Sequence, residues 1–254
     1  MLLQKNTLRL YNIKLQNRLK GDFFIYMHLE IIYQDDYLVA LNKPHDLLVH
    51  RSPIARNAEQ FAVQLLRDQI GQRVYPVHRL DRKTSGVLLF ALDQVTNRAL
   101  TEQFTLKTTC KKYLAVVRGY APDESMIDYP LFKENGTLQE AVTKIKTLER
   151  AEIDLPHGKH ATSRYSLIEA EPLTGRMHQI RKHMAHILHP IIGDRPHGCN
   201  KQNKLWLENF NMKTMLLHAH SLTFQHPVTG KEIIVRAQPS PAFSEVCKML
   251  QFTL

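Results

Sequence analysis

Short apolar runs, separated by turn-forming residues, predict strands in the first half of the chain. Residues 29–33 and 37–41 are rich in β-branched and aromatic side chains and flank a polar turn, which predicts a strand pair. Residues 87–92 form a nearly continuous apolar run of buried-strand length. Residues 113–117 form another apolar run. We therefore expect the first half of the chain to supply several strands of one sheet.

Apolar residues at helical spacing predict two helices between these strands. The first spans residues 57–70, with Asn57 as its N-cap and Gly71 as its stop. Its apolar face consists of Phe61, Ala62, Leu65, Leu66 and Ile70. The second begins after Asp93, which is a favourable N-cap residue. Its inward residues are expected to be Val95, Ala99, Leu100 and Phe104.

The pattern weakens between residues 123 and 160, where charged residues, prolines and glycines interrupt the apolar positions. We interpret this segment as an insertion with short strands of its own. Regular patterning resumes with a strand at 164–169 and a helix at 176–187, followed by a hairpin of residues 216–224 and 231–235. Elements in this order predict an α+β fold, with a mixed, largely antiparallel sheet flanked by helices.

Composition adds a strong positive charge to this picture. The chain has 254 residues, a hydrophobic content of 43% and a formal net charge of +10, which indicates a soluble domain with a polyanionic partner such as nucleic acid. An anionic membrane surface is a weaker alternative. No stretch approaches the roughly 20 apolar residues of a membrane span. The three cysteines lack paired spacing, which is typical of a reducing cytoplasm.

His78-Arg79-Leu80-Asp81-Arg82 places one carboxylate among basic residues just before a predicted strand. An opposite charge within a few ångströms lowers the pKa of an aspartate by about 1–3 units, so we expect Asp81 to be ionised. An ionised carboxylate can act as a nucleophile or as a base. A surface salt-bridge cluster at the end of a strand is an equally good interpretation of this segment alone.

Two further clusters have side chains suited to nucleic acid. Arg176 and Arg181 lie at the predicted start of a helix, with His178 between them, where bidentate contacts suit phosphates. A solvated basic helix face is the alternative. Lys112 precedes Tyr113, whose ring could stack on a base for about 1–3 kcal/mol. A core tyrosine with a hydrated hydroxyl is the simpler interpretation.

Metal and nucleotide cofactors are not expected. Four histidines crowd the second cluster: His178, His183, His186 and His189. There is no His-Glu-x-x-His motif and no cysteine pair, and the neighbouring arginines and lysines would repel a cation. His218 and His220 alternate along a predicted strand and are expected to line a groove or a surface. The chain has no phosphate-loop or dinucleotide glycine pattern.

In combination, these motifs resemble the RluA family of RNA pseudouridine synthases. The resemblance rests on His78-Arg79-Leu80-Asp81 with Thr84-Ser85-Gly86, Lys112-Tyr113 with Arg118-Gly119, Thr174-Gly175-Arg176 with His178-Gln179-Ile180-Arg181, and Pro190-Ile191-Ile192-Gly193-Asp194. Residues 29–35, 42–44, 49–52, 67–72 and 161–165 are most similar to the tRNA pseudouridine-65 synthase (TruC) branch.

The resemblance implies the pseudouridine synthase fold with a central RNA-binding cleft, and it assigns roles to residues. Asp81 matches the catalytic aspartate, Tyr113 the tyrosine that packs on the target uracil, and Arg181 the partner of the aspartate. Tyr113 is also a candidate base for a proton abstraction. Arg79 matches the side chain that enters the RNA stack when the uridine leaves it. The residues expected to bind RNA are Arg79, His78, Arg82, Lys112, Arg176 and His178.

The implied reaction isomerises a uridine to pseudouridine without any cofactor. The implied substrate is tRNA, with the target at position 65 in the acceptor-stem region. The same reaction on ribosomal RNA and a catalytically silent RNA-binding relative are the alternatives, and a metallohydrolase is a third. We expect a monomer in the cytoplasm.

Residues 1–28 are expected to form a basic extension outside the catalytic domain, which would span residues 29–254. Met27 directly precedes the first predicted strand and is an alternative start. We expect no S4-type RNA-binding module of the kind that several relatives have, because the 28 residues before Leu29 are too few for one.

Overall fold

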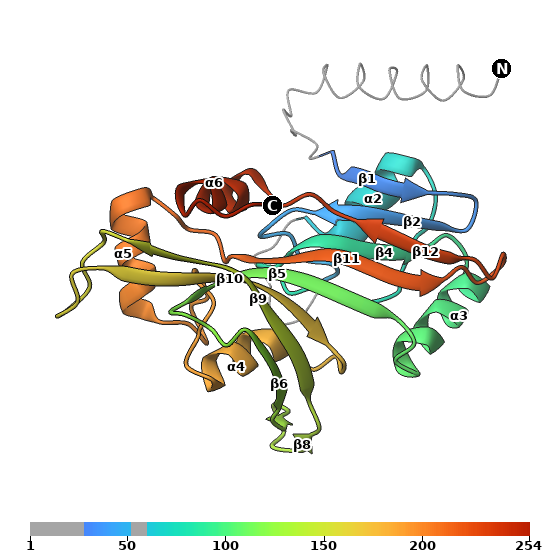
Figure 1. Cartoon of the computed structure of the whole chain (residues 1–254). Helices are drawn as coiled ribbons and strands as arrows, with labels where there is room; N and C mark the ends of the chain where they lie inside the picture. Colours follow the sequence, from blue (N-terminus) through green and yellow to red (C-terminus); the bar gives the residue numbers. More distant parts are fainter. Residues whose placement is uncertain (1–27, 52–59) are drawn as a thin grey trace, which may run out of the picture.

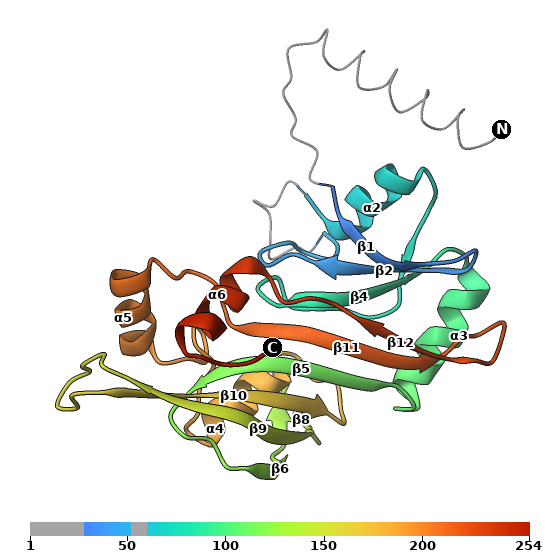
Figure 2. The same cartoon turned by 45° about the horizontal axis from the view of Figure 1, so that its top comes forward.

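The computed structural model describes residues 28–51 and 60–254. Within these ranges, ten strands form one sheet: β1 (Glu30–Gln34), β2 (Leu38–Lys43), β3 (Tyr75–Pro76), β4 (Ser85–Ala91), β5 (Cys110–Arg118), β6 (Glu124–Asp128), β9 (Val142–Ile153), β10 (Ser163–Pro172), β11 (Leu217–Gln225) and β12 (Glu232–Arg236). The main order is β1-β2-β4-β11-β5-β10-β9-β6, which Figure 2 shows from β1 to β9. The pairings are antiparallel except for β4 with β11. The expected mixed, largely antiparallel sheet is confirmed.

Helices cover both faces of this sheet (Figure 1). They are α2 (Ala62–Ile70), α3 (Gln94–Thr105), α4 (Gln179–His186), α5 (Asn200–Phe210) and α6 (Pro241–Met249). Because successive side chains of a strand point to opposite faces, β4 and β5 sort their residues between two layers. Leu88 and Phe90 pack in the cluster of α2, whereas Leu89 packs with α3. In the same way, Ala115 packs with α4, and Leu114 packs with α5 and α6.

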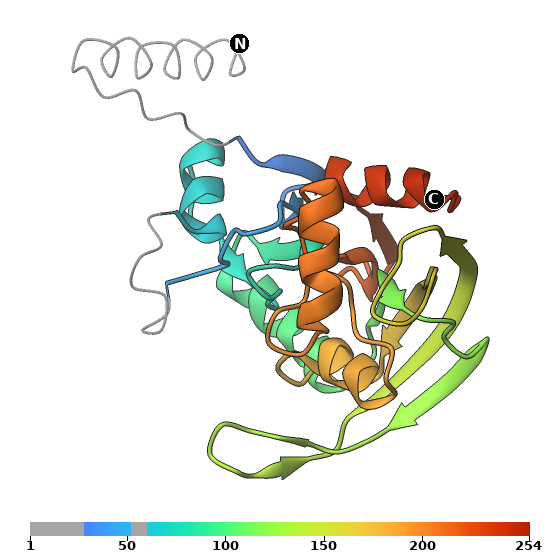
Figure 3. The same ribbon diagram turned by 90° about the vertical axis from the view of Figure 1, so that its left-hand side faces the viewer.

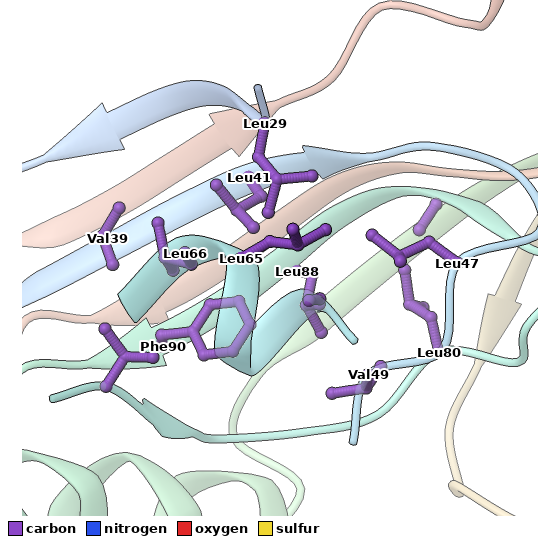
Figure 4. Close-up of a cluster of buried hydrophobic side chains, with 13 residues drawn as sticks. Leu29, Val39, Leu41, Leu47, Val49, Leu65, Leu66, Leu80, Leu88 and Phe90 are labelled. Carbon is purple, nitrogen blue, oxygen red and sulfur yellow. The ribbon is translucent and has the colours of Figure 1, made fainter. Parts of the chain in front are cut away.

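The cluster around α2 fixes the chain just before the Asp81 loop. Leu80 is 7% exposed and packs with Leu47, Val49 and Leu88 (Figure 4). Burying a leucine side chain contributes roughly 1.5–3 kcal/mol, so Leu80 anchors its neighbour Asp81 to the core. The α2/α4 face of the sheet is therefore the face that positions the candidate chemistry.

The parallel contact between β4 and β11 pairs Ser85 with His218 and Gly86 with Ala219. Gly86 has a φ of 109°, and a Cβ at this position would overlap the backbone carbonyl oxygen of Ala219. No other residue type fits here without moving one of the two strands.

We therefore expect Gly86→Ala to lower the free energy of unfolding by about 2–5 kcal/mol, because backbone strain and steric overlap add. Gly71→Ala is the matched control. Its φ is 73°, but nothing lies within 4 Å of the added Cβ, so a loss of about 1–2 kcal/mol is expected. Urea unfolding of the two variants measures the difference. Equal losses would contradict the close-contact argument.

Two helix starts differ from the prediction. The first helix begins at Ala62, because Phe61 is extended (φ −136°, ψ 141°) and forms a bridge with Leu48. Asn57, the expected N-cap, lies outside the described residues. The expected stop at Gly71 is confirmed by its left-handed backbone. The helix expected at 176–187 begins at Gln179.

Other predictions were wrong in detail. Val95 is 80% exposed, although Asp93 caps its helix as expected. Residues 123–160 are not a separate insertion, since β6 and β9 extend the main sheet beside β10. The charged, exposed positions that alternate along β9 hid this strand from the apolar pattern. The hairpin β7 (Leu131–Phe132) and β8 (Leu138–Gln139) projects from the end of this extension (Figure 3).

His218 does not line a groove. It is a residue of β11 and is fully buried, with its Nδ1 2.9 Å from Ser85 Oγ of β4 and its Nε2 3.0 Å from the carbonyl oxygen of Ala237. Because a carbonyl oxygen only accepts, Nε2 carries the proton and Nδ1 accepts from the serine hydroxyl. His218 therefore stabilises the central pair of strands β4 and β11 by a side-chain hydrogen bond between them.

Candidate active site

Three charged side chains from distant parts of the sequence are joined by hydrogen bonds, with Arg181 between the carboxylates of Asp81 and Asp194. Arg181 Nη1 donates to Asp81 Oδ2 (2.9 Å), while its Nε and Nη2 donate to the two carboxylate oxygens of Asp194 (2.8 Å each). The side chains of Arg181 and Asp194 are 6% and 1% exposed, whereas that of Asp81 is 27% exposed. Asp81 is thus the member of the contact that a substrate can reach.

The guanidinium is held from behind by a bidentate pair, which fixes its plane. The remaining Nη1 group is therefore directed at Asp81. Two carboxylates surround one arginine, and burial alone would lower the pKa of that arginine, but hydrogen bonds and charge from Asp194 and Asp81 raise it overall. Arg181 is a permanent cation at this site.

Buried groups support the loop that carries Asp81. The side chain of Lys43 is fully buried at the end of β2, and its Nζ donates to the carbonyl oxygens of Pro44, Leu47 and Arg82. The contact with Arg82 holds the backbone immediately after Asp81. Burial lowers the pKa of Lys43 to about 7, and the charge of Asp81 opposes this shift. A buried lysine whose charge is sensitive to pH near neutrality thus lies close enough to Asp81 to interact with its charge.

Tyr113 on β5 lies on the same face of the sheet, partly buried between the α2 and α4 clusters. Burial raises the pKa of its hydroxyl, and the nearby Asp81 carboxylate raises it further. The phenol is therefore protonated at neutral pH. The predicted trio of Asp81, Tyr113 and Arg181 is brought together in space.

His178 lies beside the trio, with its Nε2 3.8 Å from Asp81 Oδ2. It occupies the N-cap position of α4 with a left-handed backbone (φ 57°) and makes no side-chain cap. Its Nδ1 lies 2.9 Å from His197 Nε2. The predicted RNA-binding role of His178 stays a prediction, and the structure places its ring beside the Asp81 carboxylate.

Side-chain hydrogen bonds fix the segments that flank α4. Gln179 Oε1 accepts from Thr174 Oγ1 (2.6 Å) and from the backbone N–H of Arg176 (3.0 Å). On the other side, Asn203 of α5 donates to the carbonyl oxygen of Asp194 (2.7 Å) and accepts from the N–H of Gly193 (2.8 Å). The helix that carries Arg181 and the loop that carries Asp194 are therefore both held rigidly.

The other residues predicted to bind RNA are either exposed or in ion pairs and hydrogen bonds with the protein itself. Arg79 is exposed, and the side chain of Arg82 turns to Asp46 (2.8 Å) rather than to Asp81. The arginines adjacent in sequence therefore do not pair with Asp81 as expected; Arg181 does. Lys112 pairs with Glu169 (2.9 Å).

Two more residues of the predicted RNA-binding set also have protein contacts. Arg176 Nε donates to the carbonyl oxygen of Glu140 (2.9 Å). His78 Nε2 accepts from the N–H of Leu89 (3.1 Å), and its ring stacks on Phe104 with centroids 4.9 Å apart. A role of these residues in RNA binding stays a prediction.

Sequence reasoning missed three residues of this site. Asp194 and Lys43 both appeared in motifs, Gly193-Asp194 and Lys43-Pro44, but neither received a role. A lone acidic residue in a basic segment was the available signal for Asp194. His197 had no local signal, because only the fold brings it to His178.

Burial makes several histidines poor bases in the folded protein. Desolvation lowers the pKa of His45, His78 and His218 to about 4 each, against about 6.5 in an unfolded chain. Between pH 6.5 and 4 the unfolded chain binds up to one more proton at each histidine. The stability that these neutral histidines contribute is complete above pH 6.5 and is lost as the pH falls toward 4.

We expect the free energy of unfolding to fall steeply in this range, by roughly 1.4 kcal/mol per pH unit for each extra proton. Urea unfolding at pH 7.5, 6 and 5 measures the slope. His218→Gln should give a shallower slope, because it removes one of the titrating groups. An unchanged slope in that variant would show that His218 does not contribute to the acid sensitivity.

Within residues 28–51 and 60–254, no group of three or more histidine, cysteine, aspartate or glutamate side chains is arranged to hold a metal ion. None of the described helices has the length and apolar character needed to span a membrane.

Comparison with known proteins identifies what this chain is similar to. The RNA pseudouridylate synthase family model matches residues 37–186. The tRNA pseudouridine synthase C of Vibrio vulnificus is 43% identical over 235 residues, which cover 88% of this chain and 96% of that protein. The protein of the same name from Vibrio cholerae is 46% identical over 220 residues, covering 82% and 90%. The solved structure of human RNA Pseudouridylate Synthase Domain Containing 4 has a similar fold, with a TM-score of 0.70 at 23% identity over 89% of this chain and 94% of that one.

Proposed function

Because the chain belongs to the RNA pseudouridylate synthase family, we propose that it isomerises one uridine of a tRNA and that Asp81 is its catalytic carboxylate. The relatives named tRNA pseudouridine synthase C support the tRNA substrate, and they match this chain over most of their length. Position 65 of the tRNA is the proposed target. The observation that carries the catalytic assignment is the Arg181 contact to a partly exposed Asp81.

In this reaction the N1–C1′ bond of uridine breaks and a C5–C1′ bond forms. One proton leaves C5 and one is gained at N1, so nothing is oxidised overall. A carboxylate can form a transient covalent bond that divides such a step into two easier ones. Asp81 is proposed for this role, since Arg181 fixes its Oδ2 atom and leaves the side chain accessible.

Tyr113 and Arg181 receive supporting roles in the proposal. Tyr113 is proposed to stack on the target uracil, and its raised pKa favours a neutral phenol over a base. Arg181 is proposed to orient Asp81 through the attacking step. Its bidentate pair with Asp194 makes this orientation independent of the substrate.

The exposed Arg79, two residues before Asp81, is proposed to occupy the space that the uridine leaves in the RNA stack. Unstacking a nucleotide costs a few kcal/mol, which backbone contacts and the pocket offset. The other proposed RNA-binding residues are His78, Arg82, Lys112, Arg176 and His178. The net charge of +10 supports phosphate contacts, and binding should therefore weaken as salt increases.

The protein is proposed to act as a cytoplasmic monomer, with residues 29–254 as its catalytic domain. Its three cysteines are free thiols, which suits a reducing compartment.

The test is to incubate the purified protein with unmodified tRNA and ribosomal RNA transcripts, and to map pseudouridine by carbodiimide adducts and primer extension. A stop at position 65 of tRNA is the expected result. Stops in ribosomal RNA alone would keep the reaction and overturn the substrate. Binding without stops in either RNA would favour a silent RNA-binding protein.

A further inference from the structure

A contact between two histidines completes a closed ring of side chains around Asp81. Arg181 joins Asp81 to Asp194, and the backbone N–H of His197 donates to Asp194 Oδ1 (3.3 Å). The His197 ring lies against that of His178, with centroids 5.1 Å apart and planes at 67°. His178 then returns to Asp81. We call these five residues the Asp81 ring.

We propose that His197 is a positioning residue for the isomerisation: it fixes the orientation and the proton placement of the His178 imidazole beside Asp81. This inference rests on the proposed role of Asp81 as the catalytic carboxylate. His197 itself does not approach Asp81 in the contacts described, so it acts through His178.

A single hydrogen bond fixes the orientation of the His178 ring. Its left-handed N-cap backbone leaves the ring without a capping bond to its own helix. The 2.9 Å contact between His178 Nδ1 and His197 Nε2 is the hydrogen bond that sets the ring plane. With Nδ1 held, Nε2 is directed at Asp81 Oδ2 at 3.8 Å, which is an electrostatic contact and too long for a hydrogen bond.

The same contact determines which nitrogen of His178 carries the proton. A neutral pair shares one proton between His178 Nδ1 and His197 Nε2, because one nitrogen must donate and the other accept. If His197 donates, His178 carries its own proton on Nε2 and presents a donor to Asp81. If His178 donates, its Nε2 lone pair faces a carboxylate. The negative charge of Asp81 selects the first arrangement.

When one proton is added, the hydrogen bond between His178 and His197 is kept. The proton then lies on His178, which donates from Nδ1 to His197 and presents Nε2–H to Asp81. A second proton would place two N–H groups against each other and break the 2.9 Å contact. His197 therefore provides the acceptor that a charged His178 needs.

Nearby charges have opposite effects on the pKa values of His178 and His197. Asp81 in the loop before β4 and Asp194 in the loop after α4 favour the protonated form. Arg181 and Lys182 on α4 disfavour it. Burial lowers the pKa of His178 and His197, so the pair is neutral at neutral pH. A charged His178 would pair with Asp81 and compete with its attack, so the rate should fall in acid.

The test compares His197→Phe and His197→Gln in single-turnover reactions on tRNA between pH 5 and 8. His197→Phe keeps a ring without a hydrogen-bonding nitrogen, and we expect the rate to fall by about 10–100-fold through misplacement of His178. We also expect the midpoint of its acidic limb to move to lower pH, because the acceptor is lost. His197→Gln retains an amide and should keep the rate within about fivefold.

The matched control is His189→Gln, since His189 contacts the carbonyl oxygen of Arg118 and no member of the Asp81 ring. Its rate and pH profile should equal those of the parent. A His197→Phe variant whose rate falls equally at every pH, without recovery in His197→Gln, would reduce His197 to a structural residue and overturn the proposal.

A second measurement separates this proposal from the proposed function. The titration of the His178 ring, followed by NMR, should move to lower pH in His197→Phe whether or not the parent modifies tRNA. An unchanged titration would overturn the inference, whereas an inactive parent with the expected shift would overturn only the proposed function.

Discussion

Asp81→Asn is expected to abolish pseudouridine formation, by at least about 10⁴-fold in rate, while leaving the protein folded and able to bind RNA. An asparagine has the shape of aspartate but is neither a nucleophile nor a base. Its side-chain oxygen can still accept from Arg181 Nη1, and Arg181 keeps its bidentate partner Asp194. The variant therefore removes the chemistry and conserves the contacts.

The matched control for this variant is Asp46→Asn. Asp46 also pairs with neighbouring cations, Arg82 and Lys83, but it is exposed and contacts neither Arg181 nor Asp81 in the described structure. Both variants remove one negative charge, so both raise the net charge of the protein by one and change its attraction to RNA by a similar amount. Primer extension on carbodiimide-treated tRNA should show full modification by Asp46→Asn and none by Asp81→Asn. Substantial modification by Asp81→Asn would assign the chemistry to another residue.

Asp194→Ala is expected to lower the free energy of unfolding by about 3–5 kcal/mol and to slow the reaction. The substitution deprives the buried Arg181 of two charge-assisted hydrogen bonds, and Asp81 alone cannot satisfy it. The freed guanidinium can also rotate away from Asp81, because the bidentate pair that fixed its plane is gone. Urea unfolding and single-turnover rates measure the two effects.

A double variant distinguishes an unpaired charge from a simple loss of packing. Arg181→Met with Asp194→Val replaces both ions by apolar groups, and such replacements are often close to neutral in stability. The double variant should therefore be more stable than Asp194→Ala alone, yet inactive. If it were no more stable, the cost of Asp194→Ala would come from cavity formation rather than from the uncompensated arginine.

Local sequence patterns predicted those helices and strands whose apolar residues recur at the regular spacing of a helix or a strand. The buried strand β4 and the hairpin of β11 and β12 were expected within a few residues of their bounds. β9 was not recognised, because its outer positions are charged. The helix α6 did have a signal, since Ser240 caps it and Pro241 opens it. In α5 only Gln202 and Trp206 are buried, which leaves no apolar stripe to find.

Sequence analysis identified site residues only where they lie in motifs that are distinctive of the family. Asp81, Tyr113 and Arg181 were identified because each lies in a distinctive segment that the family resemblance joined. The neighbouring Arg82 was wrongly expected to pair with Asp81, whereas the Arg181 partner that the resemblance implied does pair with it, from 100 positions away. His197 contacts a residue 19 positions away and Asn203 one that is 9 positions away, and no local pattern encodes those contacts.

The parallel contact of β4 with β11 has a kinetic consequence. It joins residues 85–86 to residues 218–219, and it is the direct strand pairing that connects β1, β2 and β4 to the rest of the sheet. Such non-local pairing forms slowly, because a long loop must close before the contact contributes any stability. Asp81 lies on one side of this seam, and Tyr113 and Arg181 lie on the other. A growing or refolding chain therefore assembles this site only after the two parts of the sheet have joined, so incomplete chains have no competent site with which to act on RNA.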